Sequence, residues 1–162
     1  MDAAGIEAAS RVREAFLSKG IRLSLAESCT GGYIAHLLTS LPGASDFLSA
    51  SIVAYSLEAK MNILGVEGEV IQRHGMISPQ CALGMAAGAA RAGRTVAALS
   101  VTGNLGPEAL EGRPVGLVYA AVLLRGRTGT REFLLEGDRD AIKAQAARAA
   151  LDLLYEALTT WG

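Results

Sequence analysis

The residues best suited to chemistry lie in the stretch LSLAESCTGG, residues 23–32. A short apolar run ends there in small polar residues and two glycines, and a helical pattern begins at Tyr33. This order predicts a strand, a sharp turn that holds Ser28, and a helix. Backbone N–H groups at a helix start have no partner within the helix, so they can bind a phosphate or a developing oxyanion. Ser28 beside such donors could be a nucleophile, or Ser28 and Thr30 could simply cap the helix.

A serine nucleophile needs a proton acceptor, and neither histidine suits that role. His36 lies inside the predicted helix and His74 in a separate segment. Lys60 is the candidate base, because burial can lower the pKa of a lysine. Tyr55, five residues earlier at a predicted strand end, could pass a proton or orient Lys60 by hydrogen bonding. The alternatives are a solvated Lys60 on a helix surface and a Tyr55 that only packs.

Cys29 is a second candidate nucleophile, since helix N-termini lower the pKa of thiols. We rank it below Ser28 because no His or Asn partner is evident for it. Cys29 and Cys81 form neither a zinc pattern nor a disulfide framework. The glycine-rich loops lack the Walker pattern and the dinucleotide fingerprint. The sequence therefore predicts a site without metal or cofactor.

Composition narrows the class of protein further. A formal net charge of −1 without runs of like charge argues against a nucleic-acid surface. No apolar stretch approaches the roughly 20 residues that a membrane span needs. The first ten residues lack the pattern of a signal peptide. We expect a cytoplasmic protein that binds a small molecule.

Helical and strand patterns alternate along the chain, which predicts one α/β domain over residues 1–162 with a mixed sheet. The expected helices are 3–19, 33–41, a short one with Lys60, 78–92 and 138–160; the expected strands are 22–26, 50–55, 95–101, 115–124 and 129–136. Residues 65–75 read as irregular or as a short helix, and the last two strands as an antiparallel hairpin. The loops 27–32, 55–60 and 102–107 all follow strands. Ligands bind at the carboxyl ends of strands in open α/β sheets, so we expect these loops to meet there.

The stretch LAESCTGG, residues 25–32, resembles the signature of the CinA C-terminal domain family, whose stand-alone members include nicotinamide-nucleotide amidases. Further matches follow in the same order: LPGAS 41–45, VAYS 53–56 with EAK 58–60, LGV 64–66, RHG 73–75 with IS 77–78, VTG 101–103, PVG 114–116 and GDR 137–139. The resemblance implies a three-layer α/β/α domain and a homo-oligomer, with a dimer expected. It also implies hydrolysis of the carboxamide of nicotinamide mononucleotide (NMN) to nicotinic acid mononucleotide and ammonia, without a metal.

By position, the resemblance makes Ser28 the nucleophile, Lys60 its base and Tyr55 an assisting hydroxyl. It assigns the oxyanion and substrate contacts to Thr30, Gly31, Gly32, Thr102, Gly103, Asn104 and Arg139. Among these, the N–H groups around Thr30 and Gly31 would form the oxyanion hole, and Arg139 would meet the substrate phosphate or pack at the rim.

The loop at residues 104–113 departs from the family pattern, because Asn104 and Leu105 stand where Ile-Ala is usual and the glycine run is missing. Two alternative functions stay open. One is a nucleotide-binding or regulatory module with little hydrolysis, and the other is an amidase for a different small amide.

Overall fold

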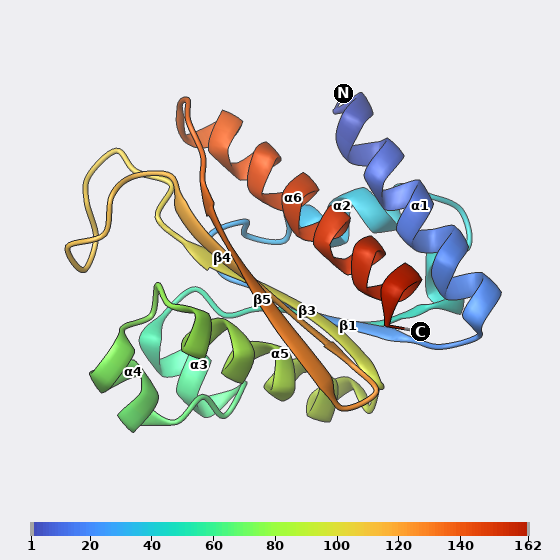
Figure 1. Ribbon diagram of the computed structural model, residues 1–162, viewed down its shortest axis with the longest axis horizontal. Coiled ribbons are helices and arrows are strands. Elements are labelled where there is room, and N and C mark those ends of the chain that lie inside the picture. Colours follow the sequence, from blue (N-terminus) through green and yellow to red (C-terminus); the bar gives the residue numbers. More distant parts are fainter. Residues whose placement is uncertain (1, 162) are drawn as a thin grey trace.

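A five-stranded mixed sheet forms the centre of the molecule in the computed structural model, which describes residues 2–161 (Figure 1). The strands lie in the order β2-β1-β3-β4-β5, with bounds β1 Leu23–Glu27, β2 Leu48–Val53, β3 Ala97–Gly103, β4 Leu117–Leu124 and β5 Arg127–Leu134. β1 pairs parallel with both β2 and β3, whereas β3–β4 and β4–β5 are antiparallel. The predicted mixed sheet and its late hairpin are confirmed.

Helices cover both faces of the sheet, which confirms the three-layer α/β/α fold (Figure 1). One face carries α1 Ala3–Lys19, α2 Tyr33–Thr39 and α6 Arg139–Thr160, and the other carries α3 Leu57–Asn62, α4 Gly68–His74 and α5 Pro79–Gly93. A short 3₁₀ turn, Ala44–Asp46, precedes β2. Two separate, mainly aliphatic cores fill the spaces between the layers, because each sheet face buries its own set of side chains.

Side-chain caps fix where α3 and α5 begin. The end of β2 and the extent of α4 differ from the predicted ones. The hydroxyl of Ser56 accepts the N–H of Ala59 at 3.0 Å, and the hydroxyl of Ser78 accepts the N–H of Cys81 at 3.1 Å. β2 ends at Val53, so Tyr55 lies in the following loop and not at the end of the strand. The segment 65–75, for which the sequence left a short helix and an irregular segment open, contains the helix α4.

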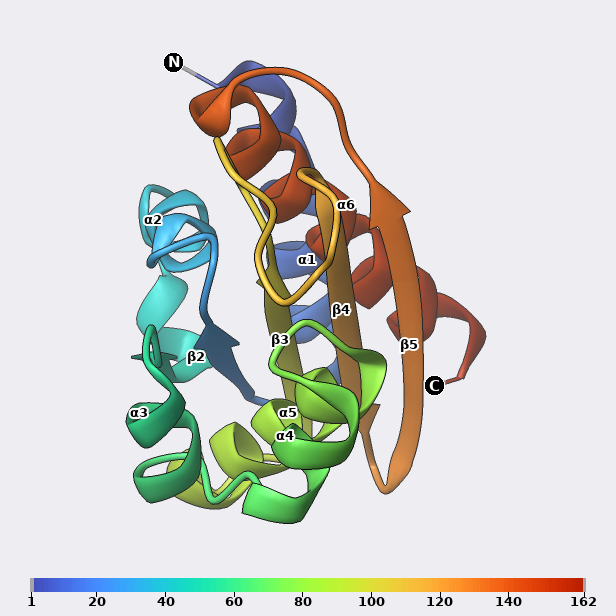
Figure 2. The same cartoon turned by 90° about the vertical axis from the view of Figure 1, so that its left-hand side faces the viewer.

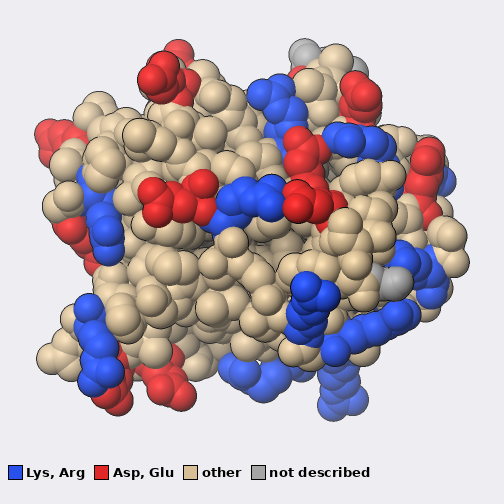
Figure 3. All heavy atoms as spheres, in the orientation of Figure 1, with Lys and Arg blue, Asp and Glu red and all other residues tan. Residues whose placement is uncertain are grey.

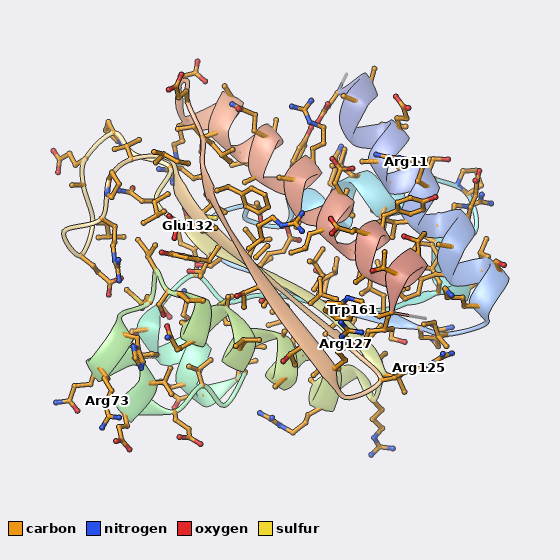
Figure 4. All side chains as sticks on the ribbon, in the orientation of Figure 1. Arg11, Arg73, Arg125, Arg127, Glu132 and Trp161 are labelled. Atoms are coloured by element: carbon orange, nitrogen blue, oxygen red, sulfur yellow. The ribbon has the colours of Figure 1, made fainter. Side chains whose placement is uncertain are left out.

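The β4–β5 hairpin is tied to the end of α6 by an aromatic contact. The guanidinium of Arg127 lies 4.6 Å from the ring centroid of Trp161, and Figure 4 shows the two side chains together at the lower right of the molecule. Charges of both signs are scattered over this face, but mainly Lys and Arg surround the same lower right edge (Figure 3). Among residues 2–161 no helix is long and apolar enough to cross a membrane, and no group of His, Cys, Asp and Glu could hold a metal ion.

Candidate active site

The three loops that follow β1, β2 and β3 meet at one end of the sheet, as the sequence predicts. Parallel pairing puts the carboxyl ends of these strands at the same edge (Figure 2). A cavity of about 510 Å³ lies there, within the range typical of small-molecule sites. Its walls are Ser28, Cys29, Tyr55, Lys60, Met76, residues 103–110 and Arg139.

Ser28 and Lys60 form a buried hydrogen-bonded pair in this cavity. The distance from Lys60 Nζ to Ser28 Oγ is 2.8 Å, and Nζ also donates to the carbonyl oxygen of Ala54 at 2.9 Å. Lys60 is 2% exposed, and no carboxylate within residues 2–161 forms a salt bridge with it. Burial therefore lowers the pKa of Lys60, and the weaker effects of Cys81, Cys29 and Glu111 act in the opposite direction.

The local sequence of α3 explains why this burial is hard to predict. Lys60 is the one buried residue of the helix, while the apolar side chains of Leu57 and Met61 are each 38% exposed. A pattern that points a lysine inward and apolar residues outward reverses the usual amphipathic helix. Tertiary packing buries Lys60, so it is not the solvated surface charge that helix statistics favour.

Glu27 occupies the start of α2, which corrects the expectation that the free N–H groups of this helix would hold a ligand. Its buried carboxylate accepts the N–H of Ile34 at 2.8 Å, the N–H of Ala35 at 3.2 Å and the hydroxyl of Thr30 at 2.8 Å. Neither Ser28 nor Thr30 caps the helix through its side chain. The positive end of α2 is thus already paired with an anion.

The turn between β1 and α2 leaves a different set of N–H groups free. Gly31 has φ +60° and donates its N–H to the carbonyl of Ser28 at 3.0 Å, so this N–H, expected in the oxyanion hole, is already engaged. Within residues 2–161, the N–H groups of Cys29, Thr30 and Gly32 have no oxygen acceptor. Of these three residues, Cys29 is the one that lines the cavity with Ser28, so its N–H is the donor placed for a ligand.

Tyr55 and Arg139 pair with each other across the cavity mouth. Tyr55 is 58% exposed, and its hydroxyl accepts from Arg139 Nη2 at 2.8 Å. Its hydroxyl therefore has a partner other than Lys60, the residue that it was expected to orient. Arg139 also donates to the carbonyl of Gly106 and forms no salt bridge with a carboxylate of residues 2–161. Its charge is available to an anionic ligand.

The side chain of Asn104 holds the loop of residues 104–113, the loop that departs from the family pattern, in its folded shape. Its Nδ2 donates to the carbonyls of Glu108, at 3.0 Å, and Arg113, at 3.3 Å, and its Oδ1 accepts the N–H of Gly106 at 2.9 Å. Asn104 is 5% exposed, so its side chain is used within the loop, although the residue lines the cavity with Gly103.

Thr102 and Gly32 do not line the cavity, and neither do Thr30 and Gly31. The Thr102 hydroxyl instead donates to the carbonyl of Met76 at 2.9 Å. Met76 is a wall residue that the sequence reasoning missed, because nothing in its local pattern links the segment before α5 to the site.

Cys29 lines the cavity, but its environment disfavours a thiolate. Burial and, to a lesser degree, the charge of Glu27 raise the pKa of Cys29 to about 12. The thiol is therefore neutral at physiological pH, which corrects the alternative that a lowered thiol pKa would make Cys29 the nucleophile.

Substitution of Cys29 by alanine is expected to keep the rate of any hydrolysis in this cavity within about tenfold of wild type, because a neutral thiol supplies little nucleophile. Steady-state rates of both proteins at pH 7.5 measure this. A loss as large as that of a Ser28 variant would assign the nucleophile to Cys29.

The protein is an α/β/α domain with a buried serine–lysine pair in a cavity at the carboxyl ends of its parallel strands. The chain belongs to the CinA family, since the model of the CinA C-terminal domain matches residues 6–158. It is 43% identical over 142 residues to a putative competence-damage inducible protein of Moorella thermoacetica, covering 87% of this chain and 34% of that protein. The chain thus spans about a third of the length of such curated relatives.

Solved structures agree with this assignment. A CinA superfamily protein from Klebsiella pneumoniae 700603 superimposes with a TM-score of 0.94 at 36% identity, over 97% of this chain and 99% of that one. The competence/damage inducible protein CihA from Agrobacterium tumefaciens gives 0.91 at 37% identity, over 98% and 97% of the two chains.

Proposed function

We propose that this protein is an amidohydrolase that converts NMN to nicotinic acid mononucleotide and ammonia, with Ser28 as nucleophile and Lys60 as base. The observation that carries the proposal is the 2.8 Å contact between Ser28 Oγ and a buried Lys60 Nζ without a carboxylate partner within residues 2–161. A lysine in such surroundings releases its proton more readily than one in water, which is what a base for serine requires.

In the first half of the reaction, neutral Lys60 takes the Ser28 proton while Oγ attacks the carboxamide carbon. The oxyanion that forms would accept the N–H of Cys29, the residue of the Cys29–Gly32 turn that lines the cavity beside Ser28 and whose N–H has no oxygen acceptor within residues 2–161. When the tetrahedral intermediate breaks down, Lys60 returns the proton to the leaving nitrogen and ammonia departs. The product of this half is an acyl-enzyme ester on Ser28.

In the second half, Lys60 takes a proton from water as the water oxygen attacks the ester carbon. The same turn stabilises the second oxyanion, and Lys60 then protonates Ser28 Oγ as the nicotinic acid mononucleotide leaves. The substrate phosphate would pair with Arg139, whose guanidinium lies in the cavity wall.

Release of ammonia and of nicotinic acid mononucleotide from NMN by the purified protein tests the proposal. Nicotinamide riboside, which lacks the phosphate, and free nicotinamide complete the substrate series. We expect both products from NMN in equal amounts and much slower release from the other two. Binding of NMN without ammonia release would favour the regulatory module instead.

An amidase for a different small amide is the second candidate, and the loop at residues 104–113 is the observation that favours it. This loop supplies a large part of the cavity wall and departs from the family pattern. Ammonia release from another amide at a higher kcat/KM than from NMN would support this candidate.

The pH dependence of kcat/KM follows from the lowered pKa of Lys60. Only the neutral amine accepts a proton, so kcat/KM should rise by tenfold per pH unit below that pKa and level off above it. The level region should begin below pH 10.5, the ordinary value for lysine. A profile measured from pH 5 to pH 10 checks this, and a rate that falls steadily with rising pH would contradict a lysine base.

A further inference from the structure

Glu111 joins two segments that lie far apart in the sequence. Its Oε2 accepts the N–H of Met76 and its Oε1 accepts the N–H of Ile77, both at 3.0 Å. Figure 2 shows the loop of residues 104–113 descending to meet the turn before α5 at this point. The carboxylate of Glu111 therefore connects the loop of residues 104–113 to Met76, which lies in the cavity wall.

Glu111 and Gly112 are the two central residues of a tight turn, in which the N–H of Arg113 donates to the carbonyl of Leu110 at 2.8 Å. The φ of Glu111 is +55°, a left-handed value that glycine adopts freely and glutamate rarely does. The next residue, Gly112, has φ +70°. A non-glycine residue with positive φ persists where surrounding contacts fix it, and here both the Leu110–Arg113 pair and the side-chain bonds to Met76 and Ile77 do so.

The bonds of Glu111 also satisfy backbone groups that would otherwise lack partners. Ile77 is 1% exposed in the folded protein, so its N–H depends on Glu111 and not on water for a hydrogen-bond acceptor. Met76 is held from both sides, because its carbonyl accepts the hydroxyl of Thr102 at 2.9 Å while its N–H binds Glu111. Met76 lines the cavity, so Glu111 fixes a wall of the site.

The other contacts of the loop do not replace this connection. Asn104 binds carbonyls and an N–H within the loop itself, and Leu110 pairs with Arg113 across the loop base. Within residues 2–161, the one additional bond from this loop to the segment before α5 is long, with Arg113 Nη2 at 3.5 Å from the carbonyl of His74. Loss of Glu111 should leave the loop folded on itself but free to move away from Met76.

We propose that Glu111 is a latch that determines specificity: it closes residues 104–113 against Met76 and so sets the width of the cavity for a mononucleotide. The proposal rests on the amidase function for its consequence but not for its geometry. With the latch open, the cavity should hold NMN less tightly and admit larger molecules that carry the same carboxamide, of which the dinucleotide NAD is the natural probe.

Hydrogen exchange tests the latch without any reference to activity. The variants are Glu111→Gly, which relieves the left-handed backbone, and Glu111→Gln, which keeps the shape but loses one acceptor. Glu69→Gln is the matched control, because Glu69 forms an exposed pair with Arg73 on α4. We expect exchange at Met76 and Ile77 to rise about tenfold or more in Glu111→Gly, less in Glu111→Gln and not at all in the control. Unchanged exchange in Glu111→Gly overturns the latch.

Kinetics then test what the latch does. In Glu111→Gly we expect KM for NMN to rise roughly tenfold while kcat stays within about threefold, since Ser28 and Lys60 keep their contact. The ratio of kcat/KM for NMN to that for NAD should fall about fivefold or more. If exchange rises but KM and this ratio match wild type, the specificity role is overturned. If the wild-type protein hydrolyses no NMN, the amidase function fails, and exchange together with calorimetric affinities for NMN and NAD still decide the role of Glu111.

Discussion

Replacement of Ser28 by alanine is expected to lower kcat for NMN hydrolysis by about 10⁴-fold or more, because no acyl-enzyme can form without the hydroxyl. Lys60→Met should have an effect of similar size, since it removes the proton acceptor while filling most of the same buried space. The double variant should be scarcely worse than either single one, because the two residues act as a unit. Initial rates of ammonia release measure all three.

Lys143→Met is the matched control for the lysine variant. Lys143 lies on α6, away from the cavity walls, so its rate should equal that of wild type within about twofold. Circular dichroism spectra and thermal midpoints show whether each variant folds. A Ser28→Ala protein that folds and keeps a tenth or more of the wild-type rate would rule out Ser28 as the nucleophile.

Replacement of Glu27 by alanine is expected to lower the free energy of unfolding by about 3–5 kcal/mol. This is the largest effect on stability that we predict for any single substitution. Three buried donors, the Thr30 hydroxyl and the N–H groups of Ile34 and Ala35, would lose their acceptor together. For a domain of this size such a loss lowers the thermal midpoint by roughly 6–20 °C. Glu27→Gln keeps the shape and one acceptor, so its loss should be smaller.

Glu132→Ala provides the comparison for Glu27. The Glu132 carboxylate accepts a single bond, from the Tyr119 hydroxyl at 3.0 Å, on the exposed strand β5. Its loss should cost less than about 1 kcal/mol. Calorimetric melting of both variants measures the difference. Equal midpoints for Glu27→Ala and wild type would mean that Glu27 does not hold the turn that carries Ser28.

The positions of the loops were predictable because they depend on local patterns. Periodicity locates most helices and strands, and strand direction places the loops after β1, β2 and β3 at one edge. The choice of Lys60 followed from chemistry by elimination, since neither histidine lay near a strand end. Bounds were less accurate where propensity is weak, as at α4 and at the end of β2.

The partners of individual side chains were not predictable in the same way. Glu27 is predicted in the loop that follows the first strand, yet its carboxylate accepts the N–H groups at the start of α2 that the sequence offered to a ligand. Tyr55 bonds Arg139, a residue 84 positions away, and not the nearby Lys60. Such choices depend on which groups three-dimensional packing brings within about 3 Å, and no local pattern encodes that.

The sequence by itself determined the α/β fold, the strand–turn–helix around Ser28 and the pairing of Ser28 with a lysine as the candidate chemistry. Tertiary structure alone decided that Lys60 is buried, that Glu27 caps α2 and that Glu111 closes the departing loop onto Met76. The reason is physical: hydrophobic periodicity is a property of neighbours along the chain, whereas desolvation and hydrogen-bond partnership depend on contacts between distant segments.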